Sequence, residues 1–161
     1  MRRPTPIAAF AFLVGLLSGC VEIKGGAVEV SWVVHANGRA ITDCGCSDPV
    51  ISKVRIKLEG RGGAIEGLKP CDGRPECEFS CQRQTGATPF DIPVTHGDEA
   101  YAVSVVAVGP EGNELPAVMT PPPILRTVLK GQPTEVNAFL LEAGCNSDCE
   151  SMNKSGVCAR P

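Results

Sequence analysis

The 161-residue chain is poor in aromatic side chains, in histidine and in positive charge. Aromatic residues make up 4% of it, it holds two histidines, and 15 Lys+Arg against 18 Asp+Glu give a formal net charge of -3. A protein that binds nucleic acid needs clustered cations to displace phosphate counterions, so this charge argues against nucleic acid as a partner. A hydrophobic content of 43% is too high for a disordered chain, and the length fits one ordinary domain.

Motifs that carry enzyme or metal chemistry are also missing. The sequence has no Gly-x-Ser-x-Gly elbow, no Gly-rich loop ending in Lys-Ser/Thr, no Asp-x-Asp-x-Asp-Gly calcium loop and no Cys-x-x-Cys zinc knuckle. A catalytic triad would need His35 or His96 beside a serine and a buried carboxylate, and His96 is expected in a solvated turn. We therefore predict a protein that is not an enzyme, with no catalytic residue, no metal and no cofactor.

The first apolar segment is too short to cross a membrane as a helix. Arg2 and Arg3 precede an apolar run over 7–17, which is 11 residues long, whereas a spanning helix needs about 20. Basic, apolar and small residues in this order are typical of an export signal, here residues 1–19. The end of the run, Leu17-Ser18-Gly19-Cys20, resembles the bacterial lipobox. This resemblance implies cleavage before Cys20 and lipid attachment to its thiol.

The lipobox resemblance makes the membrane the first expected partner. Acyl chains on Cys20 would hold the protein to a membrane surface without spanning it. Val21 stands where the enterobacterial sorting rule places Asp for retention in the inner membrane, which implies the outer membrane of a Gram-negative bacterium. Residues 20–26, with Gly25-Gly26, are expected to form the lipidated N-terminus and a short tether. A secretory signal that ends in an unrelated cysteine is the alternative.

Residues 27–143 have the pattern of short β-strands. Alternation of apolar and polar side chains is clearest over 28–35, 50–59 and 101–108. Further strands are expected around 76–82, as an edge strand at 89–93, and at 115–119, 124–130 and 134–142. With no convincing amphipathic helix, these seven or eight strands predict an all-β fold, a single immunoglobulin-like (prealbumin-like) antiparallel β-sandwich stapled by disulfides.

Three details of these strands can be predicted from the residues. Trp32 is expected to be the central packing residue of a core with few aromatics. The alternation of Lys53, Arg55 and Lys57 with apolar residues predicts a sheet with one wet face. In the last strand, alternation places Val136, Ala138 and Leu140 on one face, against Glu135, Asn137 and Phe139.

The segment Phe90-Asp91-Ile92-Pro93, a glycine turn at Gly97 and the strand Tyr101-Ala102-Val103-Ser104-Val105 resemble the transthyretin-like and carboxypeptidase-regulatory-like sandwich modules. The chain is also similar to small bacterial lipoproteins with a Val-x-Val-x-Trp strand after the lipid-bearing cysteine. The resemblance implies the fold and almost no chemistry. Hydroxyisourate hydrolysis, known in the transthyretin-like group, is rejected because Ala40 replaces the Pro of its Gly-Arg-Pro element and the C-terminal Tyr-Arg-Gly-Ser is absent.

Eight cysteines remain besides Cys20, an even number that in an exported protein predicts four disulfides. They form a pair and two triplets in the sequence: Cys44 and Cys46; Cys71, Cys77 and Cys81; Cys145, Cys149 and Cys158. A Cys44–Cys46 bond would close a strained ring, so both are expected to pair outward. The simplest scheme then has one bond inside each triplet and one bond from the Cys-rich tail, residues 144–161, back to the Cys44/Cys46 loop.

These features favour a membrane-anchored envelope lipoprotein that acts as a non-catalytic binding or structural accessory module. Its partner is expected to be an envelope protein or glycan, bound through loops such as 60–75 or through the tail. One alternative is a disulfide-rich protease-inhibitor-like module that presents Arg74-Pro75. Another is a redox or metal protein that uses Cys44 and Cys46. A role of the Lys53/Arg55/Lys57 face against peptidoglycan or lipid phosphate is a further possibility.

Overall fold

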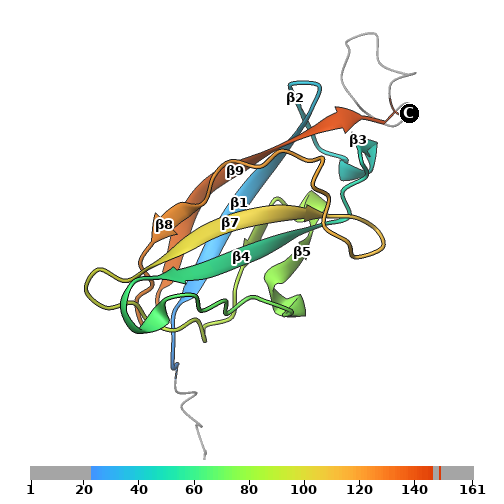
Figure 1. Ribbon diagram of the computed structural model, residues 1–161. Coiled ribbons are helices and arrows are strands. Elements are labelled where there is room, and N and C mark those ends of the chain that lie inside the picture. Colours follow the sequence, from blue (N-terminus) through green and yellow to red (C-terminus); the bar gives the residue numbers. More distant parts are fainter. Residues whose placement is uncertain (1–22, 147–148, 150–161) are drawn as a thin grey trace, which may run out of the picture.

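Two β-sheets pack face to face in the computed structural model, which describes residues 23–146 and residue 149 (Figure 1). The first sheet has the strand order β2-β1-β9-β3, with β6 paired to another part of β1, and the second has the order β5-β4-β7-β8. The strands are β1 (Ala27–Ala36), β2 (Arg39–Ile41), β3 (Ser47–Asp48), β4 (Lys53–Arg61), β5 (Glu78–Ser80), β6 (Thr85–Ala87), β7 (Ala100–Val108), β8 (Ile124–Arg126) and β9 (Pro133–Cys145).

Short 3-10 turns supply the remaining regular structure of the described chain. They are η1 (Cys44–Cys46), η2 (Gly63–Ile65), η3 (Pro75–Cys77) and η4 (Cys81–Arg83). No helix within the described residues is long and apolar enough to span a bilayer. The prediction of an all-β, two-sheet domain with disulfides is therefore confirmed.

The core lies between the two sheets and is built from the alternating strands that the sequence indicates. Trp32 on β1 is buried, with 1% of its surface exposed, which confirms its expected packing role. From the opposite sheet, β4 and β7 bury their inward faces against it. The buried strand residues are Val28, Val30, Trp32 and Val34 of β1, Val54, Ile56 and Leu58 of β4, Tyr101, Val103 and Val105 of β7, and Val136, Phe139 and Leu141 of β9.

The expectation of an entirely antiparallel sandwich is wrong for the first sheet. Strands β1 and β9 pair in parallel, from Ala27 beside Pro133 to Ala36 beside Ala143. Alternation within a strand shows which side chains are buried but carries no information on the direction of its neighbour. The first and last strands thus run side by side in the same direction, as Figure 1 shows.

An irregularity in β9 also overturns the predicted assignment of its two faces. Val30 lies opposite Val136, but Trp32 lies opposite Phe139, so β9 holds one extra residue between these pairs. The bulge changes the phase of the alternation, so that Phe139 and Leu141 are buried while Ala138 and Leu140 are exposed. Only Val136 keeps its predicted place in the core.

Two predicted strands are absent from the described fold, and three short strands, β2, β3 and β6, were not predicted. Residues 89–93 contribute a single bridge, Gly26 to Ile92, because the flanking prolines cannot donate to a ladder. Residues 115–119 are interrupted by a turn in which Val118 N donates to the Leu115 carbonyl at 3.1 Å, again around a proline. Strand β6, with the sequence Thr-Gly-Ala, was missed because it has no apolar alternation.

Candidate functional site

A hollow of about 270 Å³ lies on the outer face of the second sheet. Its floor is formed by two cross-strand pairs of β4 and β7: Lys57 beside Ser104, and Glu59 beside Ala102. Because strand side chains alternate, these four residues face away from the core that Ile56 and Leu58 help to fill. The sheet therefore presents two charges of opposite sign next to a hydroxyl and a methyl group.

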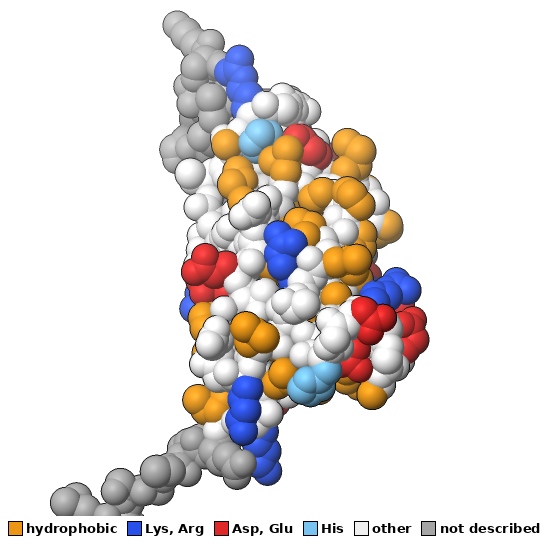
Figure 2. Space-filling view, turned by 90° about the vertical axis from the view of Figure 1, so that its left-hand side faces the viewer, with side chains coloured by type: hydrophobic (Ala, Val, Ile, Leu, Met, Phe, Trp, Pro, Cys, Tyr) orange, Lys and Arg blue, Asp and Glu red, His pale blue; other side chains and the backbone are white. Residues whose placement is uncertain are grey.

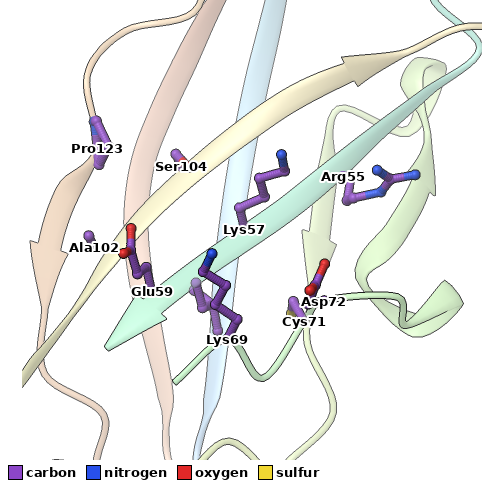
Figure 3. Close-up of a pocket in the computed structure, with 10 residues that line it drawn as sticks. Arg55, Lys57, Glu59, Lys69, Cys71, Asp72, Ala102, Ser104 and Pro123 are labelled. Carbon is purple, nitrogen blue, oxygen red and sulfur yellow. The ribbon is translucent and has the colours of Figure 1, made fainter. Parts of the chain in front are cut away.

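The walls of the hollow come from segments outside the strands. Lys69, Cys71 and Asp72 stand on the loop after η2, and Pro123 stands on the segment that leads into β8 (Figure 3). Figure 3 shows Lys69 and Asp72 on the opposite side of β4 from Ala102 and Pro123. The hollow thus combines residues that are distant in the sequence.

Close backbone contacts hold the loop wall against the end of β4. Gly60 N donates to the Leu68 carbonyl at 2.7 Å, and Gly67 N donates to the Gly60 carbonyl at 3.0 Å. A Cβ at Gly60 would lie 1.8 Å from the Ile65 carbonyl oxygen, so only glycine permits this approach. The Cys71–Cys77 disulfide closes the next part of the loop. Lys69 and Asp72 are therefore carried by a fixed segment.

An ion-pair network borders the hollow at Arg55. The Arg55 guanidinium donates to Glu78 from Nε at 2.8 Å and from Nη2 at 2.6 Å, and to Glu114 from Nη1 at 2.9 Å. Lys57 also contacts Glu114, at 2.7 Å. Hydrogen bonds from Arg55 hold the pKa of the Glu78 carboxyl below its ordinary value, and those from Lys57 do the same for the pKa of Glu114. Both carboxylates are thus ionised at neutral pH.

Lys69 differs from the other cations of the hollow. Its side chain is exposed, and within the described residues it has neither an ion-pair nor a hydrogen-bond partner. Arg55 and Lys57, in contrast, are already neutralised by carboxylates. Lys69 is therefore the cation most available to an anionic group entering the hollow.

The cysteines of the predicted scaffold form buried disulfides, and among those described only Cys71–Cys77 borders the hollow. Cys44 pairs with Cys81, Cys46 with Cys149, and Cys71 with Cys77. These pairs fit the scheme in which Cys44 and Cys46 each pair outward and one bond lies inside the middle triplet. Cys145 is also disulfide-bonded. Cys20 and Cys158 lie outside the described residues, so the lipid site and the expected bond inside the tail triplet stay predictions.

The structure does not bring the residues of the alternative functions into a matching arrangement. Neither Cys44 nor Cys46 is a free thiol, and both are buried. Among the described residues, no group of histidine, cysteine and acidic side chains could hold a metal ion. Arg74, the residue that an inhibitor loop would present, donates to both Asp91 oxygens, at 3.1 and 2.9 Å, and Pro75 begins the 3-10 turn η3.

Neither histidine lies in the hollow. His35 Nδ1 is 3.3 Å from Glu142 on the neighbouring strand β9. His96 is exposed in the turn before β7, as expected, and its backbone N–H donates to Glu99 at 2.9 Å. The sequence pointed to Arg55, Lys57 and the 60–75 loop as possible binding surfaces. It did not identify the other side chains that line the hollow. A signal for the hollow was present in the sequence on the outward face of β4, where Lys57 and Glu59 alternate with buried residues.

Comparison of the chain with protein-family models, with curated proteins and with solved structures found no match.

Proposed function

We propose that this protein is a lipid-anchored lipoprotein of the bacterial cell envelope that acts as a non-catalytic binding module. Anchoring rests on the lipobox resemblance at Cys20 and on the preceding signal. Three disulfides within the described residues, together with the disulfide-bonded state of Cys145, fit an oxidising compartment such as the periplasm or the cell surface. Val21 after the lipid-bearing cysteine favours the outer membrane.

The finer fold assignment is part of this proposal. A prealbumin-like or immunoglobulin-like sandwich is supported by the position of the Tyr101–Val105 strand, which lies between β4 and β8 in the second sheet. The parallel pairing of β1 with β9 is a feature that the resemblance did not imply. The sandwich would serve as a rigid frame for binding residues at its surface.

The hollow beside Lys69 is the observation that carries the binding role. Its size is close to the lower limit for small-molecule sites, about 300 Å³, and suits one sugar unit or a short peptide segment. Lys69 offers an unpaired cation, Ser104 a hydroxyl, and Ala102 with Pro123 an apolar contact. This combination fits a ligand with a carboxylate next to an apolar group, as in a peptide-bearing envelope glycan.

A non-catalytic role agrees with the electrostatics of the network. Glu78 and Glu114 have lowered pKa values, and Arg55 has a raised pKa because Glu78 and Glu114 accept its hydrogen bonds and outweigh the effect of its burial. None of these groups is therefore poised to exchange a proton at neutral pH. The network stabilises charge and orients side chains for binding.

Calorimetric titration of the full mature protein with a muropeptide that carries stem-peptide carboxylates tests the binding role. We expect measurable binding, and at least a tenfold weaker affinity for Lys69→Glu because attraction is replaced by repulsion. Lys130→Glu makes the same charge change at an exposed position outside the hollow and is expected to bind like the wild type. An uncharged N-acetylglucosamine oligomer should bind weakly. Equal affinities of the two variants would rule out the hollow as the site.

A further inference from the structure

The N-terminal end of the sandwich carries exposed cationic and apolar side chains next to the point where the chain enters the described fold. Ile23, Phe90 and Leu129 are 42%, 44% and 52% exposed. Lys24 and Lys130 are also exposed. Figure 2 shows Lys or Arg side chains at the lower end of the molecule.

Backbone hydrogen bonds fix these side chains relative to one another. Gly131 N donates to the Gly25 carbonyl at 2.9 Å, which places the Leu129–Lys130 turn beside the Ile23–Lys24 segment. Gly26 and Ile92 exchange two bonds of 3.0 and 3.1 Å, which place the Phe90 loop at the same end.

Glycines at these positions allow the close approach. A Cβ at Gly25 would lie 2.3 Å from the Ile92 carbonyl oxygen, and one at Gly26 would lie 2.3 Å from the Leu129 carbonyl oxygen. Both contacts are far shorter than van der Waals distance. The three segments therefore form one surface, which we call the tether surface: Ile23, Lys24, Phe90, Leu129 and Lys130.

The tether surface keeps its positive charge. Within the described residues, neither Lys24 nor Lys130 has an ion-pair partner. Asp91, which stands on the adjoining loop, is bound through both of its oxygens by Arg74. Exposed cations next to exposed apolar side chains are the combination that binds the interface of an anionic bilayer.

The short stretch of chain between Cys20 and Ile23 places the tether surface close to the membrane. Only Val21 and Glu22 separate Cys20 from Ile23, and three residue steps span at most about 11 Å even when fully extended. Acyl chains on Cys20 would therefore keep this end of the sandwich within about 11 Å of the headgroups. The end with η1 and β3 lies at the opposite end of the molecule (Figure 1).

We propose that the tether surface docks on anionic phospholipid headgroups, so that the sandwich is held upright on the membrane with its Cys-rich end directed away from it. This orientation rests on the proposed lipid anchor. It goes beyond anchoring, because a lipid on a flexible tether alone would leave the domain free to tumble. It also leaves the hollow beside Lys69, on the side of the sandwich, open to the aqueous phase.

Lysine footprinting of the lipidated protein tests this orientation. The protein, purified from its own membrane, is reconstituted in phosphatidylglycerol-containing or pure phosphatidylcholine vesicles, labelled with a membrane-impermeant amine-acetylating reagent and mapped by peptide mass. We expect acetylation of Lys24 and Lys130 to be about fivefold lower in the anionic vesicles. Lys53 and Lys57 on β4 and Lys69 on the loop after η2 serve as internal references and are expected to react equally in both. Equal labelling of Lys24 and Lys130 in the two vesicles would overturn the inference.

A pair of variants separates docking from a general charge effect. Lys130→Glu is expected to restore labelling of Lys24 in anionic vesicles, whereas Lys69→Glu, with the same charge change, should leave Lys24 protected. Loss of protection in both variants would contradict a localised docking surface. The intact mass of the same sample distinguishes the two proposals: without an acyl mass the anchor itself fails, and with it but without protection only the orientation fails.

Discussion

Trp32 Nε1 donates a hydrogen bond of 2.8 Å to the carbonyl oxygen of Cys81, and both residues are buried. The bond joins β1 of the first sheet to η4, the turn that follows β5 of the second sheet. Cys81 is in turn bonded to Cys44. The only tryptophan of the chain thus links the core to the disulfide scaffold.

Replacement of Trp32 is expected to show the contribution of this bond. Trp32→Phe removes the indole donor and leaves the buried Cys81 carbonyl with only the Gln84 N–H, at 3.3 Å, which should lower the free energy of unfolding by about 1–2 kcal/mol. Urea unfolding with the disulfides intact measures the change. Val33→Ala, on the half-buried outward side of β1, is the control and should cost less than about 1 kcal/mol. Equal losses for the two variants would contradict a special role of the bond.

The disulfides are expected to differ in their contribution according to the length of chain that each closes. Cys46–Cys149 spans 103 residues and Cys71–Cys77 spans 6. Restriction of the unfolded chain then gives about 4.7 kcal/mol for the long loop and about 2 kcal/mol for the short one. The free energies of unfolding of two double variants, one with both Cys46 and Cys149 replaced by Ala and one with both Cys71 and Cys77 replaced by Ala, test which disulfide contributes more. A greater loss on removal of Cys71–Cys77 would show that native contacts, rather than chain entropy, dominate.

Tyr101 carries a buried hydroxyl with no hydrogen-bond partner among the described residues. Burial raises the pKa of this phenol to about 12. Because Tyr101 is the only tyrosine of the chain, absorbance titration reports it alone. We expect a midpoint near 12 in the folded protein and near the ordinary value of about 10 after unfolding. A folded-state midpoint near 10 would contradict the burial of the hydroxyl.

The raised pKa of Tyr101 has a consequence for stability at high pH. As the pH rises, the unfolded chain loses the phenolic proton before the folded protein does. The contribution of Tyr101 to the free energy of unfolding is therefore fully present below about pH 10 and is lost as the pH rises toward 12. Tyr101→Phe removes both this dependence and the unsatisfied hydroxyl, and should change the free energy of unfolding at pH 7 by less than about 1 kcal/mol. A destabilisation of several kcal/mol would indicate a hidden partner of the hydroxyl.

The Arg55 network is expected to make stability depend on acid pH. The lowered pKa values of Glu78 and Glu114 contribute stability above the ordinary carboxyl value of 4.5, which is lost as the pH falls through the folded-state values. Arg55→Met should cost about 1 kcal/mol at pH 7 and flatten the acid limb of the stability curve. Arg61→Met, which removes a more exposed pair with Glu59, is the control. Unfolding curves between pH 3 and about 7 decide whether the two variants differ.

The sequence predicted those parts of the fold that depend on local alternation. The buried face of β1, the central position of β7 and the Asn37-Gly38 turn, with φ of 52° and 75°, follow from residue type alone. The parallel partner of β1 and the bulge beside Val136 depend on contacts between the two ends of the chain. No pattern within one strand could reveal them.

Only part of the hollow could be predicted from the sequence. Charged residues on the outer face of β4 were identified, but Ser104, Ala102 and Pro123 carry no chemical signal by themselves. They become lining residues because β7 pairs with β4 in one particular register and because the loop held at Gly60 carries Lys69 beside them. A bond from the tail to the Cys44/Cys46 loop was predicted because cysteine clusters restrict their own partners, but which of the two cysteines forms it, Cys46, was not.

The central claim is a lipid-anchored protein with a disulfide scaffold, and the intact mass of the protein from its own membrane tests it most directly. Removing 19 of the 161 residues leaves 142, and the account predicts that mass plus acyl chains on Cys20. It also predicts no gain of mass on alkylation without reductant, because in this account all eight other cysteines form disulfides. An unacylated N-terminus would contradict the anchor, and alkylation of two or more thiols would contradict the scaffold.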